Sequence, residues 1–240
     1  MPPIDRANVR NRLLRALPQD VFTHFSRSLQ KVDLALRQVL VQPDEPTTHV
    51  YFLEFGLASV VATSADHETV EVGHIGREGM SGGHLLLKTD QTPNRTFMQA
   101  EGGGLRIEAA EFKAFVEANP VARDLLLRYI HCSELQLAHS ALANARYSVH
   151  ERLARWLLMC HDRLDGDDLA LTHEFLAIML GVRRSGVTDQ IHILEGMGAI
   201  KATRGRIRIL DRKRLERIAG GSYGIPEREY DRLIGAVEKT

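Results

Sequence analysis

The sequence has few cysteines and no long apolar run, and each of these absences excludes a class of protein. Its 240 residues include only Cys132 and Cys160. Two isolated thiols cannot form a cysteine-rich zinc site or hold an iron–sulfur cluster, and they are typical of the reducing cytoplasm, where we expect the protein to work. No apolar stretch approaches the roughly 18 residues that a membrane-spanning helix requires, so no membrane partner is expected.

Charge is balanced over the whole chain but not along it. Lysine and arginine together number 31, as do aspartate and glutamate, so the formal net charge is zero. Between residues 183 and 217, however, there are 10 basic residues and only 4 acidic ones. A locally basic segment is typical of a surface that binds a polyanion, but it also occurs on ordinary solvated faces. Charge alone leaves both interpretations open.

Short apolar runs separated by turn residues fill the first half of the chain. Glycine, proline and aspartate separate the runs at 39–41, 50–53, 57–62, 70–72, 95–100 and 105–107. This pattern predicts an antiparallel β-roll, and the lack of alternating strand and helix units argues against a doubly wound sheet. The rest of the chain has helical patterns, so the predicted fold class is α+β.

A long helix is predicted over residues 121–145, after a proline that suits a first helical turn. At the α-helical rise it would be about 36 Å long, more than one small sensor domain covers. Its apolar stripe can pack on the chain's own sheet or pair with a second copy along a coiled-coil-like seam. We expect a homodimer whose seam contains Leu126, Ile130, Leu137 and Ala141.

The segment from Thr172 to Glu195 has the spacing of a helix–turn–helix. Thr172 is a good N-cap for a first helix that ends at Leu180, and Gly181 can adopt the positive φ of a tight turn. The small Ala177 allows a second helix to cross closely. The buried face of that second helix is predicted to consist of Val187, Ile191 and Leu194.

The polar residues left exposed on this motif are those that contact DNA in helix–turn–helix proteins. A recognition helix presents its N-terminal side chains to the major groove, where arginine is the commonest reader of guanine. Residues 199–210 then predict a β-hairpin with Gly205 at its turn, a wing that would contact phosphates. The candidate DNA-binding residues are Thr172, His173, Arg183, Arg184, Ser185, Thr188, Arg204 and Arg206.

The order of a β-roll, a long helix and a winged helix–turn–helix resembles the Crp/Fnr family of bacterial transcription regulators. The resemblance covers about residues 10–220 and is most specific in the helix–turn–helix and its wing. It implies a homodimer on a palindromic operator in double-stranded DNA, an effector that reorients the DNA-binding domains, and contact with RNA polymerase. It divides the chain into an effector-sensing roll similar to a cyclic-nucleotide-binding jelly roll (1–120), a dimerisation helix (121–145), a winged helix–turn–helix (146–221) and a C-terminal tail (222–240).

The sensor half departs from the pattern of the family's cyclic-nucleotide-binding members, which place a Gly-Glu pair and an Arg-Ser/Thr pair around the ligand. Here Arg95-Thr96 resembles the second pair, but a Gly-Gly-His sequence replaces the first, and Glu78 is out of register. The effector is therefore not expected to be cyclic AMP, and no cofactor is predicted. Arg95 could bind another anion or lie in solvent at a strand end. The candidate effector-binding residues are Gly82, Gly83, Arg95 and Thr96.

Two other functions compete with a DNA-binding regulator. A cyclic-nucleotide-binding regulatory module without DNA binding would explain the roll but not the basic hairpin. A serine hydrolase is suggested by Gly79, Ser81 and Gly83, which match Gly-x-Ser-x-Gly, but the flanking sequence lacks the strand–turn–helix that this motif requires. A zinc motif begins at His173 but has Ala177 in place of its second histidine, so neither a metal site nor an enzyme is expected.

Overall fold

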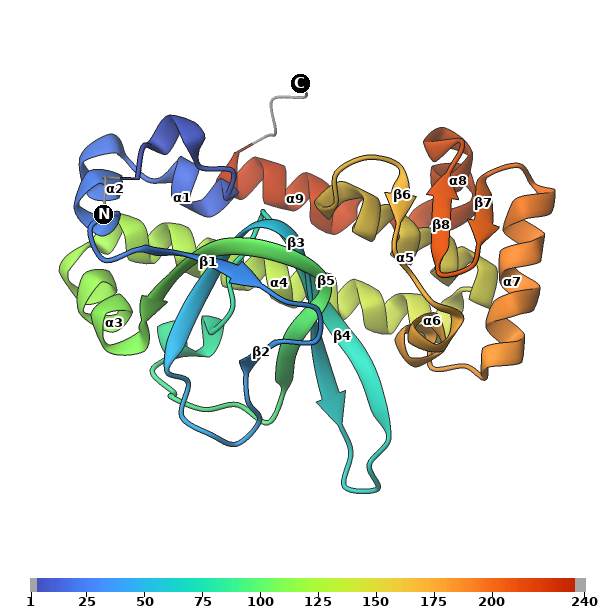
Figure 1. Cartoon of the computed structure of the whole chain (residues 1–240), viewed down its shortest axis with the longest axis horizontal. Coiled ribbons are helices and arrows are strands. Elements are labelled where there is room, and N and C mark those ends of the chain that lie inside the picture. Colours follow the sequence, from blue (N-terminus) through green and yellow to red (C-terminus); the bar gives the residue numbers. More distant parts are fainter. Residues whose placement is uncertain (1–3, 236–240) are drawn as a thin grey trace.

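The computed structural model describes residues 4–235 and arranges a β-roll, a long helix and a helical C-terminal domain along one axis (Figure 1). The roll is a five-stranded antiparallel sheet in which β1, β5, β3 and β4 are neighbours in that order and β2 pairs with β5. The predicted α+β class with an antiparallel N-terminal sheet is confirmed. The strands are β1 (Gln30–Leu34), β2 (Val39–Val41), β3 (His49–Thr63), β4 (Thr69–Ile75) and β5 (Arg95–Glu108).

Strands β3 and β5 are longer than the apolar runs predict. Each joins two predicted strands into one, and the glycines taken for turns lie within them. Gly56 has φ +87°, and a Cβ added to it would lie 2.6 Å from the Cα of Gly102. The register between the two strands shifts on both sides of Gly56, as at a β-bulge. The glycines therefore bend two continuous strands past each other instead of ending them.

Short helices close one end of the roll. They are α1 (Arg12–Ala16), α2 (Gln19–Phe25) and α3 (Ala109–Ala118). Phe25 stacks on Phe115 of α3 with ring centroids 3.9 Å apart, and Phe22 and Phe112 are buried nearby. Burying each such side chain contributes roughly 1.5–3 kcal/mol, so this aromatic cluster holds the N-terminal helices on the roll.

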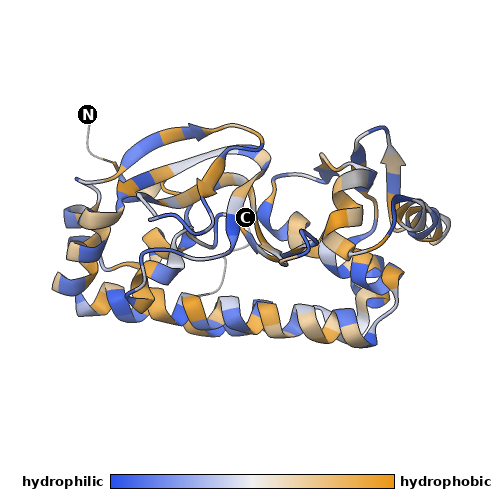
Figure 2. Cartoon of the chain, turned by 90° about the horizontal axis from the view of Figure 1, so that it is seen from below, coloured by the Kyte–Doolittle hydropathy of each residue, from blue (hydrophilic) through white to orange (hydrophobic). Residues whose placement is uncertain are grey.

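The long helix α4 (Pro120–Arg146) passes along the roll and continues to the C-terminal domain (Figure 2). It exceeds the predicted helix by one residue at each end. Leu126 is only 3% exposed and belongs to the roll's own core, whereas Leu137 is 43% exposed. Ile130 is half-buried and Ala141 is exposed. The expectation for Leu126 was therefore wrong: its turn of α4 packs within the chain, and only the later part of the stripe is free.

The C-terminal domain surrounds helix α5 (Val149–Arg163), which begins with a capping box formed by Ser148 and Glu151. Its core includes Leu157, Leu176 and Val187, together with Leu57 of the roll, so the two domains share an apolar contact. None of the described helices is long and apolar enough to cross a membrane. The other elements are β6 (Asp168–Leu169), α6 (His173–Leu180), α7 (Arg184–Gly196), β7 (Ile200–Thr203), β8 (Arg206–Ile209) and α8 (Arg212–Ala219).

The segment predicted as a C-terminal tail contains a docked helix, α9 (Ile225–Ile234). It returns from the C-terminal domain and packs on α4. The buried Tyr230 donates its hydroxyl hydrogen to the carbonyl oxygen of Glu78 at 2.6 Å, and the Arg12 guanidinium lies 4.3 Å from the Tyr230 ring centroid. Arg12 also pairs with Asp231 at 2.8 Å. Helix α9 therefore links the end of the chain to the N-terminal sensor region.

Candidate functional site

Helices α6 and α7 form the predicted helix–turn–helix. The Thr172 hydroxyl caps α6 by accepting from the Phe175 amide at 3.2 Å, and Gly181 ends it at φ +61°. On α7 the predicted buried face is confirmed, because Val187, Ile191 and Leu194 are at most 1% exposed. These apolar contacts fix the second helix against the domain and turn its first residues outward.

The first turn of α7 presents its polar side chains to solvent. Arg183, Arg184 and Ser185 are exposed. Thr188 is half-buried, and its hydroxyl lies 3.0 Å from Nδ1 of His173 and donates to the Arg184 carbonyl at 3.3 Å. His173 and Thr188 therefore join α6 to α7, while the two arginines remain available to an external partner.

The basic residues of this domain fall into two groups that the sequence does not distinguish. Lys201 pairs with Glu195 at 3.4 Å, and Arg208 pairs with Asp168 at 2.6 Å. The Arg208 hydrogen bonds lower the pKa of Asp168, so this pair stays charged near neutral pH. Among the described residues, no acidic side chain forms an ion pair with Arg183, Arg184, Arg204 or Arg206.

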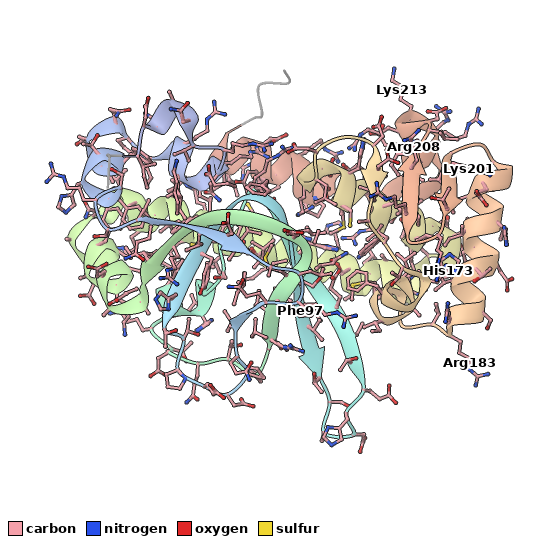
Figure 3. All side chains as sticks on the ribbon, viewed as in Figure 1. Phe97, His173, Arg183, Lys201, Arg208 and Lys213 are labelled. Carbon is pink, nitrogen blue, oxygen red and sulfur yellow. The ribbon has the colours of Figure 1, made fainter. Side chains whose placement is uncertain are left out.

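These unpaired arginines belong to one side of the domain. Figure 3 shows Arg183 pointing away from the body of the molecule at the start of α7, with Lys213 far from it at the other end of the domain. The β7–β8 hairpin turns at Gly205, where φ is +73°, and this turn lies toward the same lower side as the start of α7 (Figure 1). We call the exposed set Arg183, Arg184, Ser185, Arg204 and Arg206 the recognition surface.

A cavity of about 310 Å³ lies between the roll and α4. Three of the four predicted effector residues line it, namely Gly82, Gly83 and Thr96. Arg95 does not line it: this residue is exposed, and its guanidinium carbon lies 5.1 Å from the ring centroid of Phe97. The structure therefore separates Arg95 from the cavity to which the sequence assigned it.

A histidine, His84, stands in the cavity wall beside Gly82 and Gly83. Nε2 of His84 lies 2.9 Å from the Thr47 hydroxyl. Burial lowers the pKa of His84 and outweighs the opposite influence of Asp90, so the imidazole is neutral near pH 7. His84 therefore contributes no positive charge to the cavity.

Three acidic residues form contacts that join the roll and the N-terminal segment to α5 and the loop just after it. We call these contacts the junction. Glu71 of β4 accepts from Trp156 Nε1 at 2.9 Å and lies 2.6 Å from Nε2 of His74. Glu78 accepts from Arg163 Nε at 2.7 Å. Sequence reasoning missed these pairs because their members are 85 residues apart.

The third acidic contact of the junction is more exposed. Asp165, just after α5, pairs with Arg10 at 2.7 Å and with Arg77 at 2.8 Å. The Arg10 hydrogen bonds and the nearby Arg77 lower the pKa of Asp165 despite some opposition from burial. The junction thus combines the contacts of Glu71 and Glu78 with two more exposed ion pairs of Asp165 at its rim.

Ser81, in the segment that matches Gly-x-Ser-x-Gly, does not have the geometry of a catalytic nucleophile. Ser81 is 1% exposed, and its hydroxyl accepts from the Tyr51 amide at 3.0 Å. The segment leads from β4 into a short 3₁₀ helix (Gly83–Leu87), whereas a nucleophile elbow joins a strand to an α-helix. This geometry contradicts the serine hydrolase alternative.

Residues 151–218 match the family model of the Crp-like helix-turn-helix domain. This segment is a Crp-like helix–turn–helix domain. The match contains α5 to α7, the wing and most of α8, so the Crp-like domain includes the whole recognition surface. The match concerns a DNA-binding domain of transcription regulators and agrees with the prediction that the chain is not an enzyme. The chain matches no curated protein in sequence.

About four-fifths of the chain has the fold of solved proteins, among them a regulator of the CRP family. A transcriptional regulator of the CRP family from Thermus thermophilus is 20% identical, with TM-score 0.65, and the alignment covers 80% of this chain and 97% of that one. FixK2 from Bradyrhizobium japonicum is 15% identical, with TM-score 0.69, covering 80% and 98%. The regulator CLP of Xanthomonas campestris, described as responsive to c-di-GMP, is 16% identical, with TM-score 0.63, covering 80% and 99%. At these identities the similarity establishes the fold alone.

Proposed function

We propose that the protein is a dimeric transcription regulator that binds an inverted repeat in double-stranded DNA and responds to an effector in its β-roll. The observation that carries the proposal is the recognition surface, because its four arginines have no acidic partner among the described residues and lie on a Crp-like helix–turn–helix. Unpaired exposed arginines on a recognition helix and wing are the groups that DNA phosphates and guanine edges attract. Such a regulator would act in the cytoplasm, and contact with RNA polymerase is expected.

The arginines of the recognition surface have two different roles in this proposal. Arg184 is exposed in the first turn of α7, where a recognition helix presents side chains to the major groove, and we assign it to a base edge. Arg204 and Arg206 lie at the wing turn, and we assign them to phosphates. The remaining contacts around the DNA major groove are assigned to Arg183 and Ser185, together with Thr172 and the His173–Thr188 pair.

The exposed part of the α4 stripe supplies the dimer seam in this proposal. Leu137 is 43% exposed, and Ala141 is exposed one turn beyond. A second copy packed along this stripe would place two α7 helices on half-sites one or more DNA turns apart, at about 34 Å per turn. Ala141→Asp should dissociate the dimer, because an unpaired carboxylate would be buried in an apolar seam. Sedimentation of the wild type as a monomer at micromolar concentration would contradict the seam.

Retardation of a random-sequence duplex at low salt tests DNA binding directly. The regulator should retard the duplex, since phosphate contacts supply non-specific affinity. The regulatory module without DNA binding should leave the duplex unretarded. The double variant Arg204→Ala with Arg206→Ala should weaken retardation, whereas Arg228→Ala on α9 should not.

A further inference from the structure

We propose that the cavity between the roll and α4 binds an uncharged, mainly apolar small molecule that carries a hydroxyl or similar polar group, and that it does not bind nucleotides or other anions. The inference deepens the proposed function by naming its effector class, and it rests on that function only for the consequence in DNA binding. The volume of about 310 Å³ lies at the small end of the range for small-molecule sites.

Apolar side chains from the roll and from α4 form most of the cavity wall. The strands contribute valines and an isoleucine, the segment after β4 contributes a methionine and a leucine, and α4 closes the remaining side. Apolar surface transferred from water to such a wall gains roughly 25 cal/mol per Å², so the wall favours an apolar ligand. The apolar lining residues are Val41, Val60, Val72, Ile75, Met80, Leu87, Ile130 and Leu137.

No lysine or arginine is among the described residues that line this cavity. Its two histidines do not replace one, because His84 is neutral near pH 7 and Nε2 of His74 lies 2.6 Å from the carboxylate of Glu71. The acidic residue in the wall, Glu134, would repel an anion. Burying a phosphate here would leave its charge unpaired, which is strongly unfavourable.

Two residues of the wall each carry a buried polar atom that has no hydrogen-bond partner among the described residues. They are Nδ1 of His74, on a side chain 2% exposed, and Nε2 of Gln136. Nε2 of His74 faces Glu71, which leaves Nδ1 for a further hydrogen bond, and the Gln136 amide nitrogen is a donor. A ligand hydroxyl can bond to groups of this kind, since it both donates and accepts.

The other polar side-chain atoms of His74 and Gln136 contact residues of the junction. His74 contacts Glu71, which also accepts from Trp156. The side-chain oxygen Oε1 of Gln136 accepts from Arg163 Nη2 at 3.3 Å. A ligand hydroxyl bound to His74 and Gln136 would therefore contact the side chains that hold α5 against the roll. The cavity is thus placed to influence the position of the Crp-like domain.

Two probes with the same ring skeleton separate charge from apolar fit. N-phenyl-1-naphthylamine is uncharged, whereas 1-anilinonaphthalene-8-sulfonate carries a sulfonate, and both fluoresce when they enter an apolar site. We expect the full chain to bind one uncharged probe per chain, at least tenfold more tightly than the sulfonate, without competition from cyclic AMP. Val60→Phe, which fills the cavity, should abolish this binding, and Val32→Phe, outside the cavity, should not.

Introducing a cationic side chain into the cavity wall should shift the selectivity from the uncharged probe toward the sulfonate. Asn94 is a half-buried residue of the wall, and Asn94→Arg should improve sulfonate binding at least tenfold. Arg95→Ala, one residue further on and outside the cavity, should change neither affinity. This pair of variants tests the charge argument even if Val60→Phe does not fold.

Three results would overturn the proposal. The first is sulfonate or cyclic AMP bound as tightly as the uncharged probe and no longer bound by Arg95→Ala. The second is probe binding that Val60→Phe leaves intact. The third is binding that appears only in the monomeric Ala141→Asp, which would make a second copy the occupant. A protein that binds the uncharged probe as expected but does not retard DNA would contradict the proposed function and leave the ligand class standing.

Discussion

The arginines of the recognition surface and those of the junction lie in opposite environments. Arg184 and Arg206 are exposed and have no acidic partner among the described residues, whereas Arg163 is 8% exposed and bonds to Glu78 and to the Met159 carbonyl. Burial lowers the pKa of Arg163, but Glu78 and the other nearby carboxylates raise it above its ordinary value. The pairing of each arginine, and not the count of basic residues, therefore separates a binding surface from an internal contact.

Removing a junction arginine should have the largest effect on stability. Arg163→Ala would leave Glu78, which is 14% exposed, without its cation. Breaking a buried pair in this way costs about 3–5 kcal/mol of unfolding free energy, whereas Arg184→Ala should stay within about 0.5 kcal/mol. Urea unfolding of both variants measures the contrast. Equal losses of stability would show that Arg163 and Arg184 are not in different environments.

Removing a recognition arginine should instead affect DNA binding. Arg184→Ala should cost about 1–3 kcal/mol on the preferred site and relax specificity at one base pair per half-site. Fluorescence anisotropy on that site and on random duplex provides the measurement. If both duplexes lose the same affinity, Arg184 contacts the backbone, and Ser185 becomes the next candidate for reading a base.

The helix–turn–helix was predictable because its determinants are local. The Thr172 cap, the positive φ of Gly181 and the buried Val187 lie within one short segment, so spacing alone specified them. The long strands were not predictable, since the Gly56–Gly102 approach depends on a contact between distant parts of the chain. The same distance hid the pairing of Glu78 with Arg163.

The effector residues were only partly predictable, and strand geometry explains why. Neighbouring residues in a strand point to opposite faces, so Arg95 and Thr96 cannot both face one cavity from a regular strand. Thr96 is 5% exposed and lines the cavity, whereas Arg95 is exposed. The alternation was visible in the sequence, but the face that turns inward depends on the fold of the roll.

A glycine in the recognition helix provides a further test of which part of α7 lies close to DNA. Gly186 lies in the first turn of α7, and a Cβ added there would have no atom within 4 Å, as is also true of Gly196 at the helix end. Either glycine-to-alanine change should stabilise the protein by up to about 1 kcal/mol. Only Gly186→Ala should weaken DNA binding, because α7 would be held further from the DNA backbone. Equal DNA affinity for the two variants would mean that Gly186 is not close to DNA.

A substitution of Asp165, at the rim of the junction, should have the smallest effect on stability, and this effect should depend on pH. Asp165 has a lowered pKa, so its pairing stabilises the fold above the unfolded value near 3.9, and this stabilisation disappears as pH falls through the folded value. Its side chain is 58% exposed, and solvent screening should limit the contribution to under about 1 kcal/mol. Asp165→Asn should be slightly less stable than wild type at pH 7 and equal to it in acid. A difference that grew in acid would contradict this assignment.

The salt dependence of DNA binding tests the central claim most directly, because it counts the cations that bind phosphates. Two double variants remove the same charge from the same wing: Arg204→Ala with Arg206→Ala takes away unpaired arginines, and Lys201→Ala with Arg208→Ala takes away cations paired with Glu195 and Asp168. The first double variant should lower the slope of log Kobs against log salt by about one unit for each phosphate that loses its arginine, and the second should leave the slope nearly unchanged. Equal reductions in both double variants would contradict the claim that pairing decides which arginines bind DNA.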